Sequence, residues 1–387
     1  MPLAWMMRIS SQDFILKIES LTVFRFVAAV IVVIFHFGQE ATGFSGLLIA
    51  GPQMVTFFFV LSGFVMAVAY FKTDKIKIRT YWWARVARIM PIYLLALLLM
   101  LVINHIKGSE HNLTALMLHL TLLQAWFSPH PLSINSPGWS LSVEAFFYLM
   151  FPLILLILKK YKISVSKMVM AALILWMITQ VILSSALSTD FYRGYPSLSH
   201  DFIFYFPLVH LCSFLWGIVG GIWFLQKKTV LTNPSKTLAL TLLSVWLIIF
   251  ILNDQMHIED LLPFTLAFES SFLSPFFLFF ILSLAMCRSK FISLLTWKPF
   301  LLLGEASYSL YILQVPIHSL YRYGFESHLT LTPLLNFCLY LILLISLSIV
   351  SFLFFEKPVN KFLRFSLPKY LIRYMPKRLP SAIARSK

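Results

Sequence analysis

The chain has 387 residues, of which 59% are hydrophobic and only 12% carry a charge. An average soluble domain has about 25% charged residues, so this composition excludes a soluble globular protein and a disordered one. The net charge of +16 would indicate a nucleic-acid partner in a soluble protein. In a membrane protein, positive charge first reports which side of the bilayer each loop occupies, and we expect no nucleic-acid partner.

Apolar stretches long enough to cross about 30 Å of hydrocarbon recur from one end of the chain to the other. They predict an all-α, polytopic transmembrane helix bundle of ten spans. The spans are expected at residues 21–38, 52–71, 89–105, 141–158, 168–188, 206–225, 237–253, 264–287, 299–320 and 331–355. An eleventh stretch, residues 113–127, is shorter and contains His119 and Gln124, so we interpret it as a re-entrant or interfacial helix.

The distribution of lysine and arginine predicts the orientation of these spans. If residues 113–127 do not cross, 27 of the 31 lysines and arginines fall in segments on the side of the N-terminus, and three fall on the other. Cytoplasmic loops carry the excess of positive charge, so we expect both termini to be cytoplasmic. We assign residues 1–365 to one membrane-embedded domain and residues 366–387 to a basic cytoplasmic tail.

The cysteines indicate neither a disulfide framework nor a metal site. Cys212, Cys287 and Cys338 are odd in number, widely separated and inside apolar segments. We therefore expect no metal cofactor.

Two ionisable side chains lie in the first span. Such residues are costly in lipid and mark functional sites unless they pair within the bundle. Arg25 and His36 are eleven residues apart, which is about 16 Å along a helix axis and nearly on the same face. A buried structural histidine is the alternative interpretation of His36. Two such residues on one face favour a polar channel with a titratable base toward its outer end.

A pair of arginines precedes the third span. Arg85 and Arg88 are three residues apart and so lie on one side of a helix. Guanidinium groups offer paired donors that suit phosphate. The same residues, with Trp82 and Trp83 beside them, are also explained as a cytoplasmic anchor at the membrane surface.

The sequence SPGWSLSVEAFFY places Trp139 and Glu144 at the outer end of the fourth span. Glu144 falls at about the same membrane depth as His36, so we expect the two to meet. In such a pair the carboxylate orients the imidazole and stabilises its protonated form, which is a general-base arrangement. Glu144 is also explained as a capping residue for the helix that begins near Ser140 or Ser142.

The ninth span, in the sequence LLLGEASYSLYILQVPIH, combines hydroxyl side chains with Gln314 and Pro316. Glycine and proline inside a span permit close approach and a kink, which are common where a cavity is lined. We therefore expect Tyr308 and Gln314 to line a cavity.

Six of these segments, in this order, resemble the acyltransferase-3 family of integral membrane acyltransferases, which modify carbohydrates and some lipids or natural products. The resemblance covers about residues 18–365. The matching pieces are the Arg25-to-His36 spacing, FFFVLSGFVMA (57–67), RVARIMPIY (85–93), PGWSLSVEAFFY (137–148), LLGEASYSLYILQVP (302–316) and FEKP (355–358).

The resemblance implies an O-acyltransferase that moves an acyl group, most often acetyl, from cytoplasmic acetyl-CoA to a hydroxyl of a cell-surface carbohydrate. The acceptor would be a glycan or glycolipid such as lipopolysaccharide O-antigen or an exopolysaccharide. It further implies a location in the bacterial cytoplasmic (inner) membrane, in contact with its lipids.

The resemblance also implies roles for individual residues. An inner group of Arg25, Arg85 and Arg88 would face an outer group of His36 and Glu144. His36 would be the catalytic base, with Arg25 and Glu144 as catalytic partners. The remaining roles are acyl-CoA binding for Arg85 and Arg88, and substrate binding for Trp139, Ser140, Tyr308 and Gln314. Family members commonly have a histidine where this chain has Gln314, which can hydrogen-bond but cannot take up a proton.

Two other classes of protein fit part of the pattern. A multi-span transporter or flippase for a lipid-linked sugar also has many spans and intramembrane charge, but it releases no CoA. A membrane scaffold would explain the basic inner face. It gives no reason for Arg25 and His36 to lie in the membrane, where ionisable residues are costly.

Overall fold

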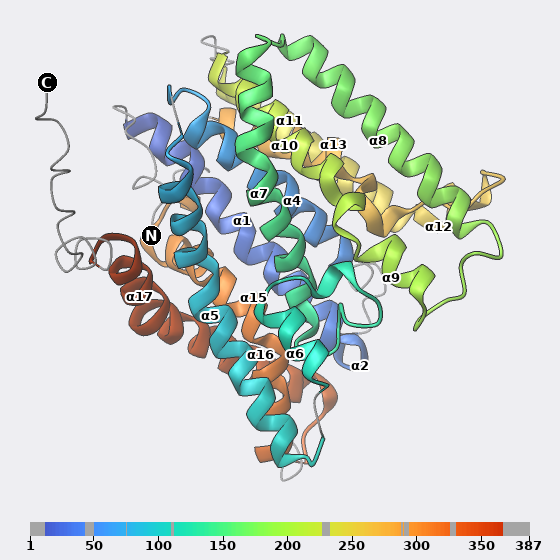
Figure 1. The fold of residues 1–387 in the computed structure, drawn as a ribbon, viewed down its shortest axis with the longest axis vertical. Coiled ribbons are helices and arrows are strands. Elements are labelled where there is room, and N and C mark those ends of the chain that lie inside the picture. The colour runs from blue at the N-terminus through green and yellow to red at the C-terminus, as the bar shows by residue number, and fades with distance from the viewer. Residues whose placement is uncertain are drawn as a thin grey trace, which may run out of the picture.

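Figure 1 shows the computed structural model of the chain, which describes residues 12–42, 50–74, 76–109, 112–226, 233–287, 289, 294–325 and 330–366. Every regular element in these residues is helical, which confirms the predicted all-α fold. Nine helical segments within the described ranges are long and apolar enough to cross a membrane. The chain is therefore a polytopic helix bundle.

Seven of these segments are single α-helices, one is interrupted, and one continues through π-helical turns. The single helices are α1 (Gln12–Phe37), α4 (Gly51–Tyr70), α5 (Ile78–Ile106), α7 (Trp139–Lys160), α8 (Val165–Leu187), α11 (Pro234–Asn253) and α15 (Lys298–Gly324). The interrupted segment joins α9 (Leu198–Phe204) to α10 (Leu211–Gln226). The continuous one joins α16 (Pro333–Ser351) to α17 (Lys357–Lys361) through a π-helical turn at Phe352–Glu356. The shorter helices are α2 (Gln39–Thr42), α6 (Leu113–Leu120), α12 (Gln255–Asp260) and α13 (Ser274–Met286).

Nine of the ten predicted spans coincide with these segments, and the span expected at residues 264–287 does not. Only α13, with 13 residues, is an α-helix there. A helix of that length covers about 20 Å, which is less than the hydrocarbon thickness. Residues 268–272 form a kinked turn in which Ser271 has a φ of 64°. Hydropathy missed the kink because the apolar residues on both sides of it outweigh Glu269, Ser270 and Ser271 in the average.

Residues 113–127 contain only the eight-residue α6 and a 3-10 turn at Gln124–Trp126. They are too short to cross as a helix, which agrees with the prediction. Ala115 of α6 packs in a small apolar cluster with Met100 of α5. Nine crossings would put the termini on opposite sides, so the cytoplasmic side of both termini stays a prediction that also requires residues 264–287 to cross. Residues 367–387 of the expected tail lie outside the described residues.

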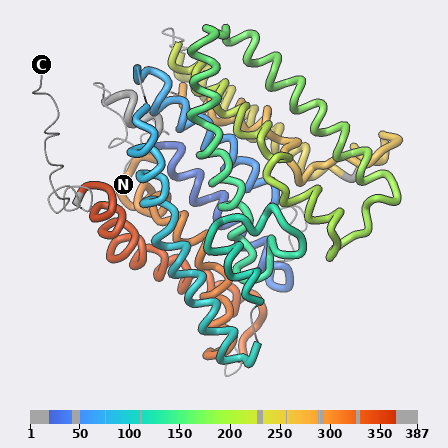
Figure 2. The backbone as a smooth tube through the Cα atoms, in the orientation of Figure 1, coloured from blue at the N-terminus to red at the C-terminus, as the bar shows by residue number. Residues whose placement is uncertain are grey.

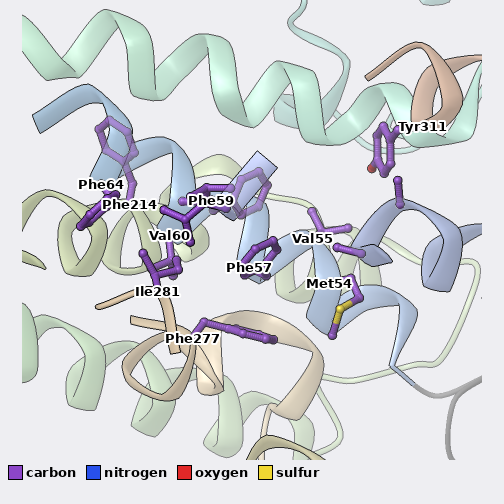
Figure 3. Close-up of a cluster of buried hydrophobic side chains, with 14 of the residues drawn as sticks. Met54, Val55, Phe57, Phe59, Val60, Phe64, Phe214, Phe277, Ile281 and Tyr311 are labelled. Atoms are coloured by element: carbon purple, nitrogen blue, oxygen red, sulfur yellow. The ribbon is translucent and has the colours of Figure 1, made fainter. Parts of the chain in front are cut away.

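Glycines bring α4 and α10 into direct backbone contact. A Cβ atom on Gly63 would lie 2.1 Å from the carbonyl oxygen of Phe214, and one on Gly217 would lie 2.0 Å from that of Val60. Any larger residue would push the helices apart. The close approach supports a buried cluster of α4, α10 and α13 side chains, including Phe57, Phe64, Phe214, Phe277 and Ile281 (Figure 3).

Helix α1 packs against α4, α13 and α15. Figure 2 shows α1, in blue, beside α15, in orange, although the two are far apart in the sequence. A Cβ atom on Gly304 of α15 would lie 2.2 Å from the carbonyl oxygen of Thr22, so this contact is also close. α8 forms one edge of the bundle in Figure 1, and α17 lies on the opposite side. The helix that carries Arg25 and His36 thus packs against three other helices of the bundle.

Candidate functional site

A cavity of about 100 Å³ lies among α1, α4, α5, α7 and α15. We call it the arginine cavity, because Arg25, Arg85 and Arg88 all line it. Its other polar lining residues are Thr22, Ser62, Ser140, Glu144, Tyr148, Ser307, Tyr308 and Tyr311. Three cations against one carboxylate make this cavity suited to an anionic or strongly polar ligand.

The three arginines are held differently. Arg85 is buried at 3% exposure, its Nη2 donates to Tyr70 Oη at 3.2 Å, and its guanidinium lies 5.5 Å from the centre of the Tyr148 ring. Such cation–π contacts hold a guanidinium in place. Arg25 and Arg88 form no hydrogen bond or ion pair with any residue that the structure describes. Their guanidinium groups are therefore available to a ligand.

Glu144 lies with the arginines and not with His36. Its Oε1 accepts hydrogen bonds from Ser62 Oγ, at 3.3 Å, and from Tyr148 Oη. It lines the arginine cavity only, so the expected pairing with His36 is not formed. Glu144 lies on the side of α7 that faces Ser62 of α4 and the arginines of α5.

A second cavity, of about 340 Å³, lies beside the first. We call it the aromatic cavity. Its lining comprises His36, Phe35, Trp139, Tyr195, His200, Phe204, Tyr205 and Tyr311, together with Val32, Gly51, Pro52, Val55, Leu132, Ser136 and Glu269. Flat aromatic faces with few polar groups suit a ligand that is itself amphipathic.

His36 is held by Gln314. The distance between His36 Nδ1 and Gln314 Oε1 is 2.9 Å. Gln314 Nε2 donates to the backbone carbonyl of Tyr311 at 2.7 Å. His36 also lines a third cavity of about 250 Å³, with Glu40, His318, Arg322 and Asn336 among its polar residues. The imidazole thus lies between the aromatic cavity and this polar cavity.

Val55 and Tyr311 line both the arginine cavity and the aromatic cavity. Tyr311 Oη lies 2.9 Å from Ser140 Oγ, and Ser140 Oγ donates to the carbonyl of Pro137 at 2.9 Å. Pro316 has no N–H for the carbonyl of Ile312, and Asn135 Nδ2 donates there instead, at 3.1 Å. The loop before α7 is therefore fastened to α15 at the wall between the two cavities.

The four residues expected to bind substrate are divided among these places. Ser140 and Tyr308 line the arginine cavity, where Tyr308 Oη donates to the carbonyl of Ile89 at 2.9 Å. Trp139 lines the aromatic cavity. Gln314 has no exposed surface and lines none of the three cavities. Gln314 contacts His36 but none of these cavities, so the prediction that it lines a cavity is wrong for the three described here.

The sequence did not indicate that Tyr311 forms part of the wall between the two cavities. It also did not indicate that Tyr195, His200 and Tyr205 line the aromatic cavity. These last three had a signal, because they lie close together in one polar segment between spans. In the described part of the chain, no three residues among His, Cys, Asp and Glu are grouped so as to hold a metal ion.

Comparisons with known proteins identify relatives of this chain. The sequence model of a family described as an acyltransferase domain matches residues 18–354. Acyltransferase MdmB of Streptomyces mycarofaciens is 30% identical over 234 residues, which cover 54% of this chain and 59% of the relative. O-acetyltransferase OatA of Staphylococcus aureus is 24% identical over 367 residues, which cover 87% of this chain and 56% of the relative.

A putative O-acetyltransferase of Staphylococcus aureus is also 24% identical, over 372 residues that cover 87% of this chain and 56% of the relative. The chain thus spans little more than half the length of these curated relatives. No solved structure matches it.

Proposed function

The chain belongs to the acyltransferase family whose domain it matches over residues 18–354, and on that premise we propose that it acetylates a hydroxyl of a cell-surface carbohydrate, with acetyl-CoA as donor. The observation that carries the proposal is the pair of cavities that share Val55 and Tyr311 as a wall. One cavity presents arginines and the other presents His36. A donor and an acceptor can therefore approach one another from separate sides.

The arginine cavity supports acyl-CoA as the donor. CoA carries phosphates, which are excluded from lipid and bind arginine well, and a thin pantetheine arm that can pass between helices. Arg25 and Arg88 form no hydrogen bond with a described residue, so each can donate to the amide oxygens of the pantetheine arm. Arg85, which is enclosed by tyrosine rings, fixes the local positive charge.

The proposed chemistry is direct transfer. His36 Nε2 accepts the proton of the acceptor hydroxyl as its oxygen attacks the thioester carbonyl carbon. The tetrahedral intermediate then collapses: the carbon–sulfur bond breaks, the ester forms, and the imidazolium returns the proton to the CoA thiolate. The products are the acetylated acceptor and free CoA, so atoms and charge balance. Tyr311 Oη of the shared wall would stabilise the negative charge on the carbonyl oxygen. Arg25 lies about 16 Å from His36 along α1 and would act on the donor instead.

The aromatic cavity supports a carbohydrate acceptor. The C–H faces of sugar rings pack on aromatic rings, and Trp139 and Tyr205 have ring centres 5.0 Å apart in this lining. An O-antigen, an exopolysaccharide or a membrane glycolipid has both the ring faces and the hydroxyls that this arrangement would use. The bacterial relatives support a location in a bacterial cytoplasmic membrane.

Release of free CoA thiol by the purified protein in lipid vesicles tests the proposal. With acetyl-CoA and an extract of surface glycans, we expect His36→Ala to lower the rate at least about 100-fold. His105→Ala is the matched control, because His105 is exposed on α5 and lines none of the three cavities. Equal rates for wild type and His36→Ala contradict the role of His36. Passage of unmodified glycan without CoA release favours a flippase.

A further inference from the structure

The hydrogen bond between His36 and Gln314 determines which imidazole nitrogen is free. The carbonyl of Tyr311 can only accept a hydrogen bond, so the Gln314 nitrogen must face it and the Gln314 oxygen must face His36. An amide oxygen likewise only accepts. The hydrogen in the 2.9 Å contact therefore belongs to His36 Nδ1. In the neutral ring, this leaves the lone pair on Nε2.

The surroundings of Gln314 hold this part of α15 beside His36. The residue is fully buried in α15, and its backbone carbonyl accepts a hydrogen bond from Tyr340 Oη at 3.0 Å. Tyr340 is itself 1% exposed and packs its ring edge-on against Phe37, the residue after His36. Because Gln314 lines none of the three cavities, it can act on a bound substrate only through His36.

We propose that Gln314 is a positioning residue that holds His36 in the Nδ1–H tautomer and so presents Nε2 as the base. The role of Nε2 as the catalytic base rests on the proposed function. The tautomer itself follows from the contacts alone. When Nε2 takes the acceptor's proton, Nδ1–H continues to donate to Gln314, so no second proton moves. A neutral amide orients the ring without the added charge that a carboxylate would contribute.

The tautomer is measured without any substrate. Nitrogen-15 NMR of the purified, histidine-labelled protein reports which ring nitrogen is protonated, and His36→Gln identifies the His36 signals by their loss. We expect Nδ1 to carry the hydrogen in the wild type, and Gln314→Met to give a mixture of tautomers. A wild-type His36 that is protonated on Nε2 overturns the proposal, whether or not the protein shows transferase activity.

Kinetics then test the consequence for turnover. Gln314→Met should lower kcat about 10- to 100-fold with little change in KM for acetyl-CoA. Gln314→Glu keeps an acceptor for Nδ1–H, so activity should persist. Its negative charge stabilises the imidazolium form of His36, so the fall in activity on the acid side should begin about one pH unit higher than in the wild type. A Gln314→Met enzyme with unchanged kcat contradicts the positioning role.

Gln180→Met is the matched control. Gln180 is also a buried glutamine whose Nε2 donates to a backbone carbonyl, that of Ser270, but it does not contact His36. The Gln180→Met substitution should alter neither the His36 tautomer nor the pH profile of activity. If Gln314→Met does not fold, the shifted pH profile of Gln314→Glu remains as the test, and an unshifted profile counts against the proposal.

Discussion

Tyr311 of α15 and Ser140 of α7 lie in hydrogen-bond contact, Oη to Oγ, at 2.9 Å. Both residues are buried, and the contact lies where the arginine cavity meets the aromatic cavity. The two hydroxyls and the carbonyl of Pro137 hold the loop before α7 against α15. An acyl group that passes from a donor in one cavity to an acceptor in the other therefore passes the Tyr311 ring.

Tyr311 should limit the length of the acyl group. Tyr311→Ala removes the ring from the shared wall, so we expect the ratio of kcat/KM for propionyl-CoA to that for acetyl-CoA to rise about 10-fold, since one extra methylene in such a pocket is worth about that factor. CoA release with a series of acyl-CoA donors measures it. Tyr311→Phe keeps the ring and removes the hydroxyl, and it should leave the ratio unchanged. A ratio unaltered in both variants shows that chain length is selected elsewhere.

Arg88 should contribute to donor binding. Arg88→Ala leaves the arginine cavity with one cation fewer, and we expect KM for acetyl-CoA to rise about 10-fold, with a weaker dependence of KM on salt. Arg79→Ala is the control, because Arg79 is exposed on the same helix and lines none of the cavities. Equal effects of the two substitutions would mean that only the general positive charge of this face matters.

The sequence predicted the parts of the site that depend on one helix at a time. Nine spans follow from hydropathy, and the same-face relation of Arg25 and His36 follows from helical spacing. The three arginines also share a cavity, as the expected inner group requires. Their catalytic and binding roles stay predictions.

The remaining geometry depends on contacts between distant segments. His36 meets Gln314 across 278 positions, and Tyr311 meets Ser140 across 171, so neither contact has a local signal. Glu144 was expected beside His36 because only its depth could be estimated. Its direction depends on the rotation of α7, which is determined by packing against other helices.

The glycine contact between α4 and α10 should be sensitive to a single methyl group. Gly217→Ala places a Cβ 2.0 Å from the carbonyl oxygen of Val60, so the backbones must separate. We expect a loss of about 1–3 kcal/mol in the free energy of unfolding. Thermal unfolding of the purified protein measures it. Gly324→Ala is the control, since a Cβ there meets nothing within 4 Å. An unchanged Tm for Gly217→Ala would contradict this close packing.

Replacing Gln53 of α4 by an apolar residue should make the folded protein more stable. It has no exposed surface, and neither its Nε2 nor its Oε1 has a hydrogen-bond partner in the described structure. An unpaired buried polar group costs about 1–3 kcal/mol, and methionine fills a similar volume without polar hydrogens. Gln53→Met should therefore raise Tm, whereas Gln124→Met should lower it, because Gln124 Nε2 donates to the carbonyl of Gly138 at 2.7 Å. A fall in Tm for Gln53→Met would show that its amide has a polar partner, such as a buried water, that stabilises the fold.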